Sequence, residues 1–221
     1  MTKLKSAEAR RITSDWAELF PEMSAWKPLR LLRRIGPVLQ GISLERSGSG
    51  DQYYPTAHVH SLVQDFPVIS ISLAHYLNKP ASMKEAVDVS RHADQYRAAA
   101  SRLEERSTLP LRRRPELGEI VHAYREFAAA AQQGRLPAGI AELEDSILVP
   151  AAAGDRALAE ESLSQVSDVS QRWSRSEAPM GWTDTQEWLD LLRAKADDPA
   201  RLMAVVDEQI AQHKLEKVRT D

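Results

Sequence analysis

The chain has 221 residues, of which 43% are hydrophobic and 28% are charged, and its formal net charge is −3 at pH 7. This composition is typical of a globular protein that buries a sizeable core, and the length allows one large domain or two small ones. The chain contains no cysteine, which excludes disulfides, thiolate zinc sites, iron–sulfur clusters and a cysteine nucleophile.

The N-terminal residues include several basic side chains, but no apolar stretch follows them, so a secretory signal is not predicted. No run approaches the roughly 18 apolar residues that a transmembrane helix requires. Together with the lack of cysteine, these features lead us to expect a cytoplasmic protein without membrane contacts.

Charge is divided unevenly along the chain. Residues 1–114 contain 18 Lys+Arg and 12 Asp+Glu, a balance of +6, whereas residues 115–221 contain 11 and 20, a balance of −9. Two faces that bind different partners would produce this division. An internal contact between a basic half and an acidic half would produce it as well.

Residues 6–34 combine helical and irregular patterns. An apolar cluster in this segment includes Trp16 and Trp26 and is interrupted by Pro21 and Pro28. Two tryptophans this close together usually belong to a core or to a docking surface. They are therefore candidate anchors for a partner wherever they reach the surface.

The following segment is the one stretch that is patterned as β-sheet. Alternating apolar and polar residues predict strands at about 38–45, 53–62 and 68–75. Flexible residues at 47–51 are typical of a hairpin connection. Because the links are short, we expect an antiparallel meander of three strands with one face covered by helices.

From residue 82 onward, apolar residues recur with the spacing of amphipathic helices. Ser82 and Thr183 are each followed three residues later by Glu or Gln, a capping-box pattern that predicts the start of a helix. Further helix starts are expected at Pro115, Pro137, Asp155 and Asp198.

The predicted fold class is α+β and predominantly α-helical. A small antiparallel three-stranded meander, at about residues 37–75, packs against a bundle of five to six amphipathic helices. We expect a main domain over residues 1–176, whose helices lie at about 82–174. A candidate linker at 177–182 then leads to a C-terminal helical pair at 183–221, which packs on the main domain.

The sharpest pattern of chemical groups is His58-Val59-His60. Residues i and i+2 of a strand point to the same face, so both imidazoles could reach one metal ion. His75, Asp65 or Glu45 could complete the ligand set, because two histidines and a carboxylate commonly form an open metal site. Alternatively, the pair lies on the solvated or edge side of the sheet and has a structural role.

Arginines gather in two clusters, and a guanidinium can bind two oxygen atoms of one phosphate or carboxylate. If the clusters share a face with Lys27 and Arg46, a footprint for nucleic acid would follow, although the sequence contains no nucleic-acid-binding motif. The same side chains could contact a protein. The clusters are Arg30, Arg33 and Arg34, and Arg112, Arg113 and Arg114.

A small sheet, several amphipathic helices and a divided charge suit the recognition of one macromolecular partner. We therefore expect a protein-binding protein that uses no cofactor, with Trp16, Trp26 and the arginines as anchors. An immunity- or antitoxin-like inhibitor is one concrete form of such a protein. The alternatives are a metal-dependent enzyme that uses the histidines, and a nucleic-acid-associated factor that uses the arginine clusters.

Overall fold

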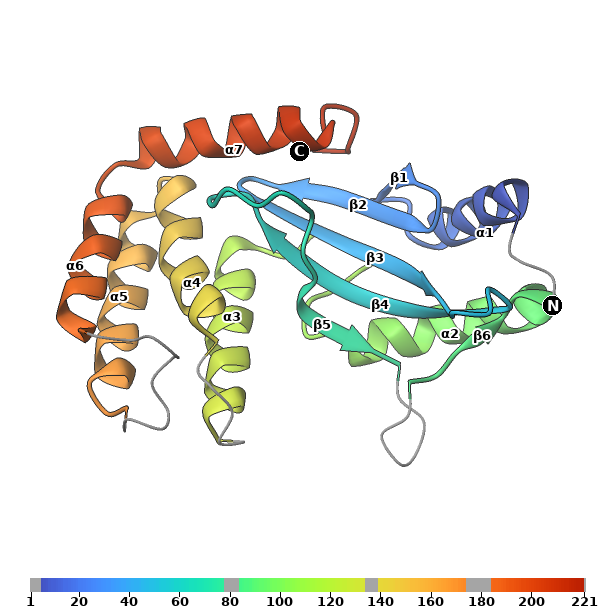
Figure 1. Ribbon diagram of the computed structural model, residues 1–221, viewed down its shortest axis with the longest axis horizontal. Helices are drawn as coiled ribbons and strands as arrows, with labels where there is room; N and C mark the ends of the chain where they lie inside the picture. The colour runs from blue at the N-terminus through green and yellow to red at the C-terminus, as the bar shows by residue number, and fades with distance from the viewer. Residues whose placement is uncertain (1–4, 78–83, 134–138, 174–183, 221) are drawn as a thin grey trace.

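The sheet and the two helices that pack on it form one end of the molecule, and a bundle of the other described helices forms the opposite end (Figure 1). The structure, a computed structural model, describes residues 5–77, 84–133, 139–173 and 184–220. It confirms the α+β class, mostly helical, with an antiparallel sheet. None of the described helices is long and apolar enough to cross a membrane.

The sheet is larger than predicted: its described part has six strands, all paired antiparallel, and not three. The strand order is β1-β2-β3-β4-β5, and β6 pairs with β4. The strands are β1 (Ser24–Lys27), β2 (Arg30–Ile35), β3 (Val38–Arg46), β4 (Gln52–Ser61), β5 (Ser72–Tyr76) and β6 (Val87–Asp88).

The predicted strands at 38–45 and 53–62 coincide with β3 and β4, and only the second half of the one at 68–75 overlaps β5, which begins at Ser72. The strands β1, β2 and β6 were not predicted. The sequence of β2 does not alternate, because Leu31 and Leu32 are both buried, one on each face of the sheet. A two-residue turn joins β2 to β3, and its Gly36 has a φ of 53°. Such a turn needs a positive φ at its first position, which glycine adopts without strain.

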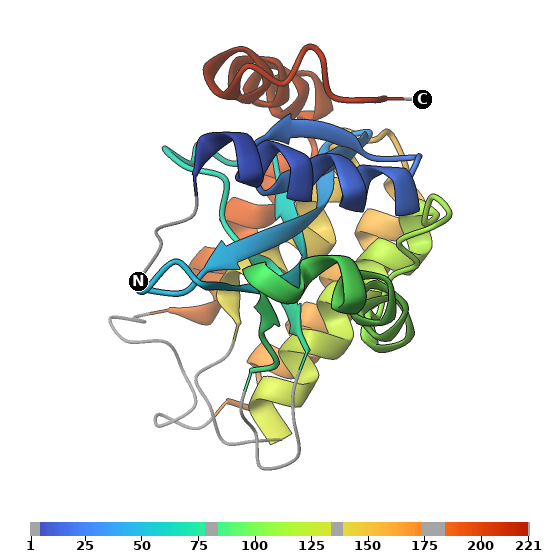
Figure 2. The same ribbon diagram turned by 90° about the vertical axis from the view of Figure 1, so that its right-hand side faces the viewer.

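Two helices, α1 (Ser6–Leu19) and α2 (His92–Arg106), pack against the sheet, and Figure 2 shows α1 lying across it. The helix expected from residue 82 begins later, after β6 and a short 3-10 turn, η1 (Val89–Arg91), and its predicted cap at Ser82 lies outside the described residues. The core between the helices and the sheet contains Ile12, Trp16, Phe20, Leu31, Ile42, Tyr53, Ala99 and Leu103.

The other end of the molecule is a bundle in which α4 is the central helix and contacts α3, α5, α6 and α7. Its helices are α3 (Leu117–Gln133), α4 (Ile140–Ala152), α5 (Arg156–Ser170), α6 (Thr185–Ala196) and α7 (Pro199–His213). The Asp155 and Asp198 side chains cap α5 and α7 as the sequence predicts, each accepting a backbone N–H at 3.0 Å.

The Thr183 cap and the candidate linker at 177–182 lie outside the described residues. The C-terminal tail, however, is described. It pairs with β2 at Arg33, next to the part of β2 that pairs with β1. The Arg34 N–H donates to the Arg219 carbonyl at 2.9 Å, and Leu215 and Val218 are buried in the core that the bundle shares with the sheet. The tail therefore ties the bundle to the sheet.

Gly41 lies in the centre of the sheet, where its missing side chain leaves room for its neighbours. A Cβ atom at this position would lie 2.8 Å from the Leu31 carbonyl oxygen and 2.9 Å from His58 Nε2. We expect Gly41→Ala to lower the free energy of unfolding by about 3 kcal/mol, because the backbone of β2 has to shift.

Urea denaturation would measure this loss. Gly48→Ala is the matched control, since a Cβ at Gly48 would meet nothing within 4 Å. Equal stability of the two variants would contradict the close approach of His58 to the backbone of β3.

Candidate protein-binding groove

The structure does not bring the predicted metal ligands together. His58 and His60 share one face of β4, but His75 is paired with Ala57 and so lies on the opposite face, where Thr108 Oγ1 contacts its Nε2 at 2.6 Å. Asp65 accepts a hydrogen bond from the Gln209 side chain at 2.9 Å. Within the described part of the chain, no group of three His, Cys, Asp or Glu side chains could hold a metal ion.

Both histidines of the pair are buried and neutral at neutral pH. Burial, followed by the positive charge of Arg30, lowers the pKa of His58 to about 3. Burial, followed by the charge of His213, lowers the pKa of His60 to about 4. The Ser70 N–H donates to His60 Nδ1 at 3.1 Å, so this nitrogen carries no proton.

The two tryptophans that were expected to be anchors have different environments. Trp16 lies in the core and not at the surface, and its Nε1–H donates to the Tyr53 hydroxyl at 3.0 Å. Trp26 is half-buried against the C-terminal tail, where its Nε1–H donates to the Lys214 carbonyl at 3.3 Å. A partner could therefore reach Trp26 but not Trp16.

The two predicted arginine clusters meet at Arg33, which contacts the Arg113 carbonyl. Arg33 is buried and donates to the Gln40 side chain and to the carbonyls of Pro110 and Arg113, and burial lowers its pKa to about 10. Arg112 donates to the Leu19 carbonyl at 3.1 Å. Arg30 and Arg34 are half-buried on β2, and the exposed ones lie at the end of β3 and before α3: Arg46, Arg113 and Arg114.

Several ion pairs lie within one half of the chain and do not join the basic half to the acidic half. Arg113 and Glu119 do join the halves, at 2.6 Å. By contrast, Arg102 pairs with Glu85 inside the first half, and further pairs lie inside the second. These are Arg125–Glu161, Arg156–Glu160 and Arg193–Asp190. Such pairs leave the acidic excess of residues 115–221 in place.

A groove opens between α3 and α5, because both helices pack on α4, which lies between them in Figure 1. Its volume is about 450 Å³. Buried Ala128, Leu143 and Val166 line its base, and half-buried Val169 extends it along α5. The base of the groove is therefore apolar.

The rim of the groove is charged. Arg125 of α3 reaches across to Glu161 of α5 at 2.8 Å and also donates to the Ser162 hydroxyl at 2.6 Å. On the α3 side, His122 Nε2 lies 3.2 Å from Glu126. An apolar base with a polar rim is the usual anatomy of a protein interface.

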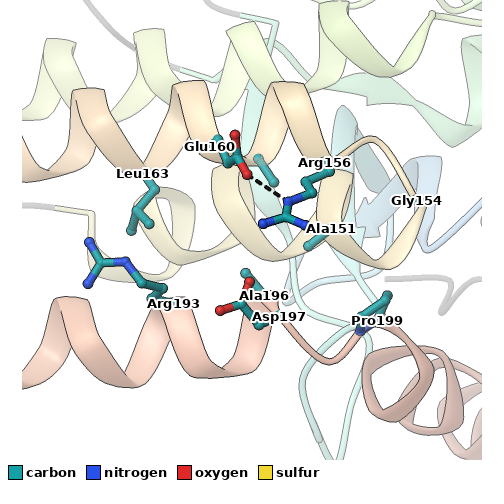
Figure 3. A pocket seen from close by; sticks show the side chains of 10 residues that line it. Ala151, Gly154, Arg156, Glu160, Leu163, Arg193, Ala196, Asp197 and Pro199 are labelled. Carbon is teal, nitrogen blue, oxygen red and sulfur yellow. Dashed lines mark hydrogen bonds and ion pairs between the residues drawn. The ribbon is translucent and has the colours of Figure 1, made fainter.

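A second hollow lies on the other side of α5, between α5 and α6, with a volume of about 490 Å³ (Figure 3). Arg156 on α5 and Arg193 on α6 line opposite sides of it. Both arginines already form ion pairs on their own helices, with Glu160 at 2.7 Å and with Asp190 at 2.9 Å. This hollow thus offers less apolar surface than the groove.

The residues of the groove were not predicted as a site, because Leu143, Val166 and Val169 belong to apolar stripes that were interpreted as core. The interpretation holds for Leu143 and Val166, which are buried. It fails for Val169, which remains half-buried, because no described helix covers the space between α3 and α5. The apolar stripe of α5 is thus longer than the surface that α4 covers.

Known proteins do not identify the chain. No protein-family model matches it, and comparisons with curated proteins and with solved structures found no match either. Function is accordingly inferred from the residues and their arrangement.

Proposed function

We propose that this protein binds another protein, and that the groove between α3 and α5 holds a helical segment of that partner. The observation that supports the proposal is the apolar base of the groove, which no described helix covers and which is lined by Ala128, Leu143, Val166 and Val169. Docking an amphipathic helix into an apolar groove is a recurring mode of recognition. It would remove this apolar surface from water, which is favourable.

The shape of the groove supports a helix over a compact small molecule. Its lining residues run from His122 to Ala129 on α3 and from Glu161 to Val169 on α5. At 1.5 Å per residue, these walls are about 10–12 Å long, which corresponds to about two helical turns. The polar side chains stand at the rim and do not converge on one point at the base, as they would for a small ligand.

The expectation of an immunity- or antitoxin-like inhibitor remains compatible with this mode of binding. In that form, the helical segment would belong to the protein that is inhibited. For an inhibitor, the partner should be inactive with the wild-type protein and active with a variant whose groove is blocked. For a scaffold, its activity should not depend on the groove.

The experiment that tests the proposal blocks the groove from its exposed rim. Ala129 is exposed on α3 and lines the groove, whereas its neighbour Ala130 is exposed and does not line it. We expect Ala129→Trp to lose the partner that co-purifies with the tagged chain from its own host, and Ala130→Trp to keep it. Native mass spectrometry of both variants would measure the loss.

Both substitutions replace an exposed alanine, so neither is expected to disturb the core. Retention of the partner by Ala129→Trp at the wild-type stoichiometry would exclude the groove as the binding site. If the tagged wild-type protein purified without any partner under gentle conditions, a tight complex would be contradicted.

A further inference from the structure

We infer that the segment held by the groove is a cationic amphipathic helix, with lysine or arginine beside its apolar face. This inference rests on the proposed function and adds the charge of the partner. It follows from the rim of the groove and from the distribution of charge over the helical bundle.

The exposed charges of the rim are mainly carboxylates. Glu126 and Glu161 stand on the two opposite walls, and their side chains are 59% and 57% exposed. The Arg125 side chain is only 16% exposed, because it is held between Glu161 and Ser162. A docked segment therefore meets a carboxylate on each side, while the guanidinium is turned toward the protein.

The helices that surround the groove also carry a net negative charge. Residues 115–221, which form the whole bundle, carry 11 Lys+Arg and 20 Asp+Glu. Because most of the ion pairs described above lie within this half, they do not neutralise the excess. An acidic surface attracts a cationic segment and repels an anionic one, and it accelerates association at low ionic strength.

A helix that fits these features has apolar side chains at positions i, i+3 or i+4, and i+7, which would contact Leu143, Val166 and Val169. Basic residues that flank this stripe on both sides would then reach Glu126 and Glu161. Exposed ion pairs contribute modestly. We therefore expect the two carboxylates together to change the affinity by about tenfold, while the apolar base supplies most of the binding energy.

The test uses two designed, fluorescein-labelled peptides of about 14 residues with the same apolar stripe and the same helix propensity. One peptide has lysines beside the stripe and the other has glutamates. Fluorescence anisotropy would measure their binding to the full-length protein at about 50 mM and about 300 mM salt. The proteins are the wild type, Ala129→Trp, the double variant Glu126→Gln with Glu161→Gln, and the control double variant Glu187→Gln with Glu208→Gln, whose carboxylates are exposed on α6 and α7.

We expect the lysine peptide to bind the wild type at least tenfold more tightly than the glutamate peptide at the lower salt concentration. The double variant at the rim should lose this preference, and the control double variant should keep it. Equal binding of the two peptides, blocked by Ala129→Trp, would overturn the cationic partner and leave the groove as a binding site. Binding that Ala129→Trp does not alter, or the lack of binding by both peptides, would overturn the inference and the proposed function together.

Discussion

Acidification from about pH 8 to about pH 5 is expected to lower the free energy of unfolding by about 4 kcal/mol through His58 and His60 alone. Both side chains are buried, and burial lowers their pKa values to about 3 and about 4. In the unfolded chain both imidazoles take up a proton near pH 6.5. The unfolded state therefore binds more protons over this range, and stability falls as the pH falls.

Urea denaturation at a series of pH values would measure the loss. His58 offers the cleaner variant, because its two ring nitrogens have no hydrogen-bond partner among the described residues. We expect His58→Leu to retain the wild-type stability at pH 8, since no hydrogen bond is broken. Between pH 8 and pH 5 this variant should lose about 2 kcal/mol less than the wild type.

The control for this prediction is His122→Gln, because the His122 side chain is exposed on α3. This variant should show the pH dependence of the wild type. If His58→Leu showed it too, His58 would be accessible to protons in the folded protein, contrary to its burial.

The second large effect on the free energy of unfolding arises from Asp145 of α4, and it lowers stability as the pH rises. Its carboxyl group is 2% exposed and accepts a hydrogen bond from the Gln64 side chain at 3.2 Å. Burial raises its pKa to about 7, and hydrogen bonds from Ser61 and Gln64 only partly oppose this rise. The folded state thus keeps its proton up to a higher pH than the unfolded state does. Stability is lost as the pH rises from about 4 to about 7.

We expect Asp145→Asn to raise the free energy of unfolding by up to about 4 kcal/mol at pH 8, because the amide is never ionised. At about pH 3.5 the variant and the wild type should be nearly equal. Thermal or urea denaturation at both pH values would measure the difference. Asp168→Asn, which changes an exposed carboxylate on α5, is the matched control and should have little effect at either pH.

If Asp145→Asn were no more stable than the wild type at pH 8, or if its gain in stability persisted at pH 3.5, the ionisation of Asp145 would not limit stability. Together with the prediction for the histidines, the expected gain at pH 8 describes two opposing contributions to the pH dependence of stability. The histidines destabilise the fold below about pH 6.5, and Asp145 destabilises it at neutral and alkaline pH.

Local patterns were sufficient to predict several elements. The alternation of apolar and polar residues predicted β3 and β4 almost to their ends, Asp155 was predicted as the start of a helix, and Asp198 was predicted as a cap. Strand alternation and helix capping depend on residues that are neighbours in the chain. β2 escaped prediction because both of its faces are covered, so its apolar residues do not alternate.

The sequence by itself determined the class of the fold, the helices and the two central strands, because the spacing of apolar residues records which side of each element is buried. Only the tertiary structure decided that Trp16 and Arg33 are interior, that His75 lies on the other face of the sheet from His58 and His60, and that no described helix covers the space between α3 and α5. Burial at these positions depends on elements that are distant in the chain. The same apolar stripe becomes core where another helix covers it and a groove where none does.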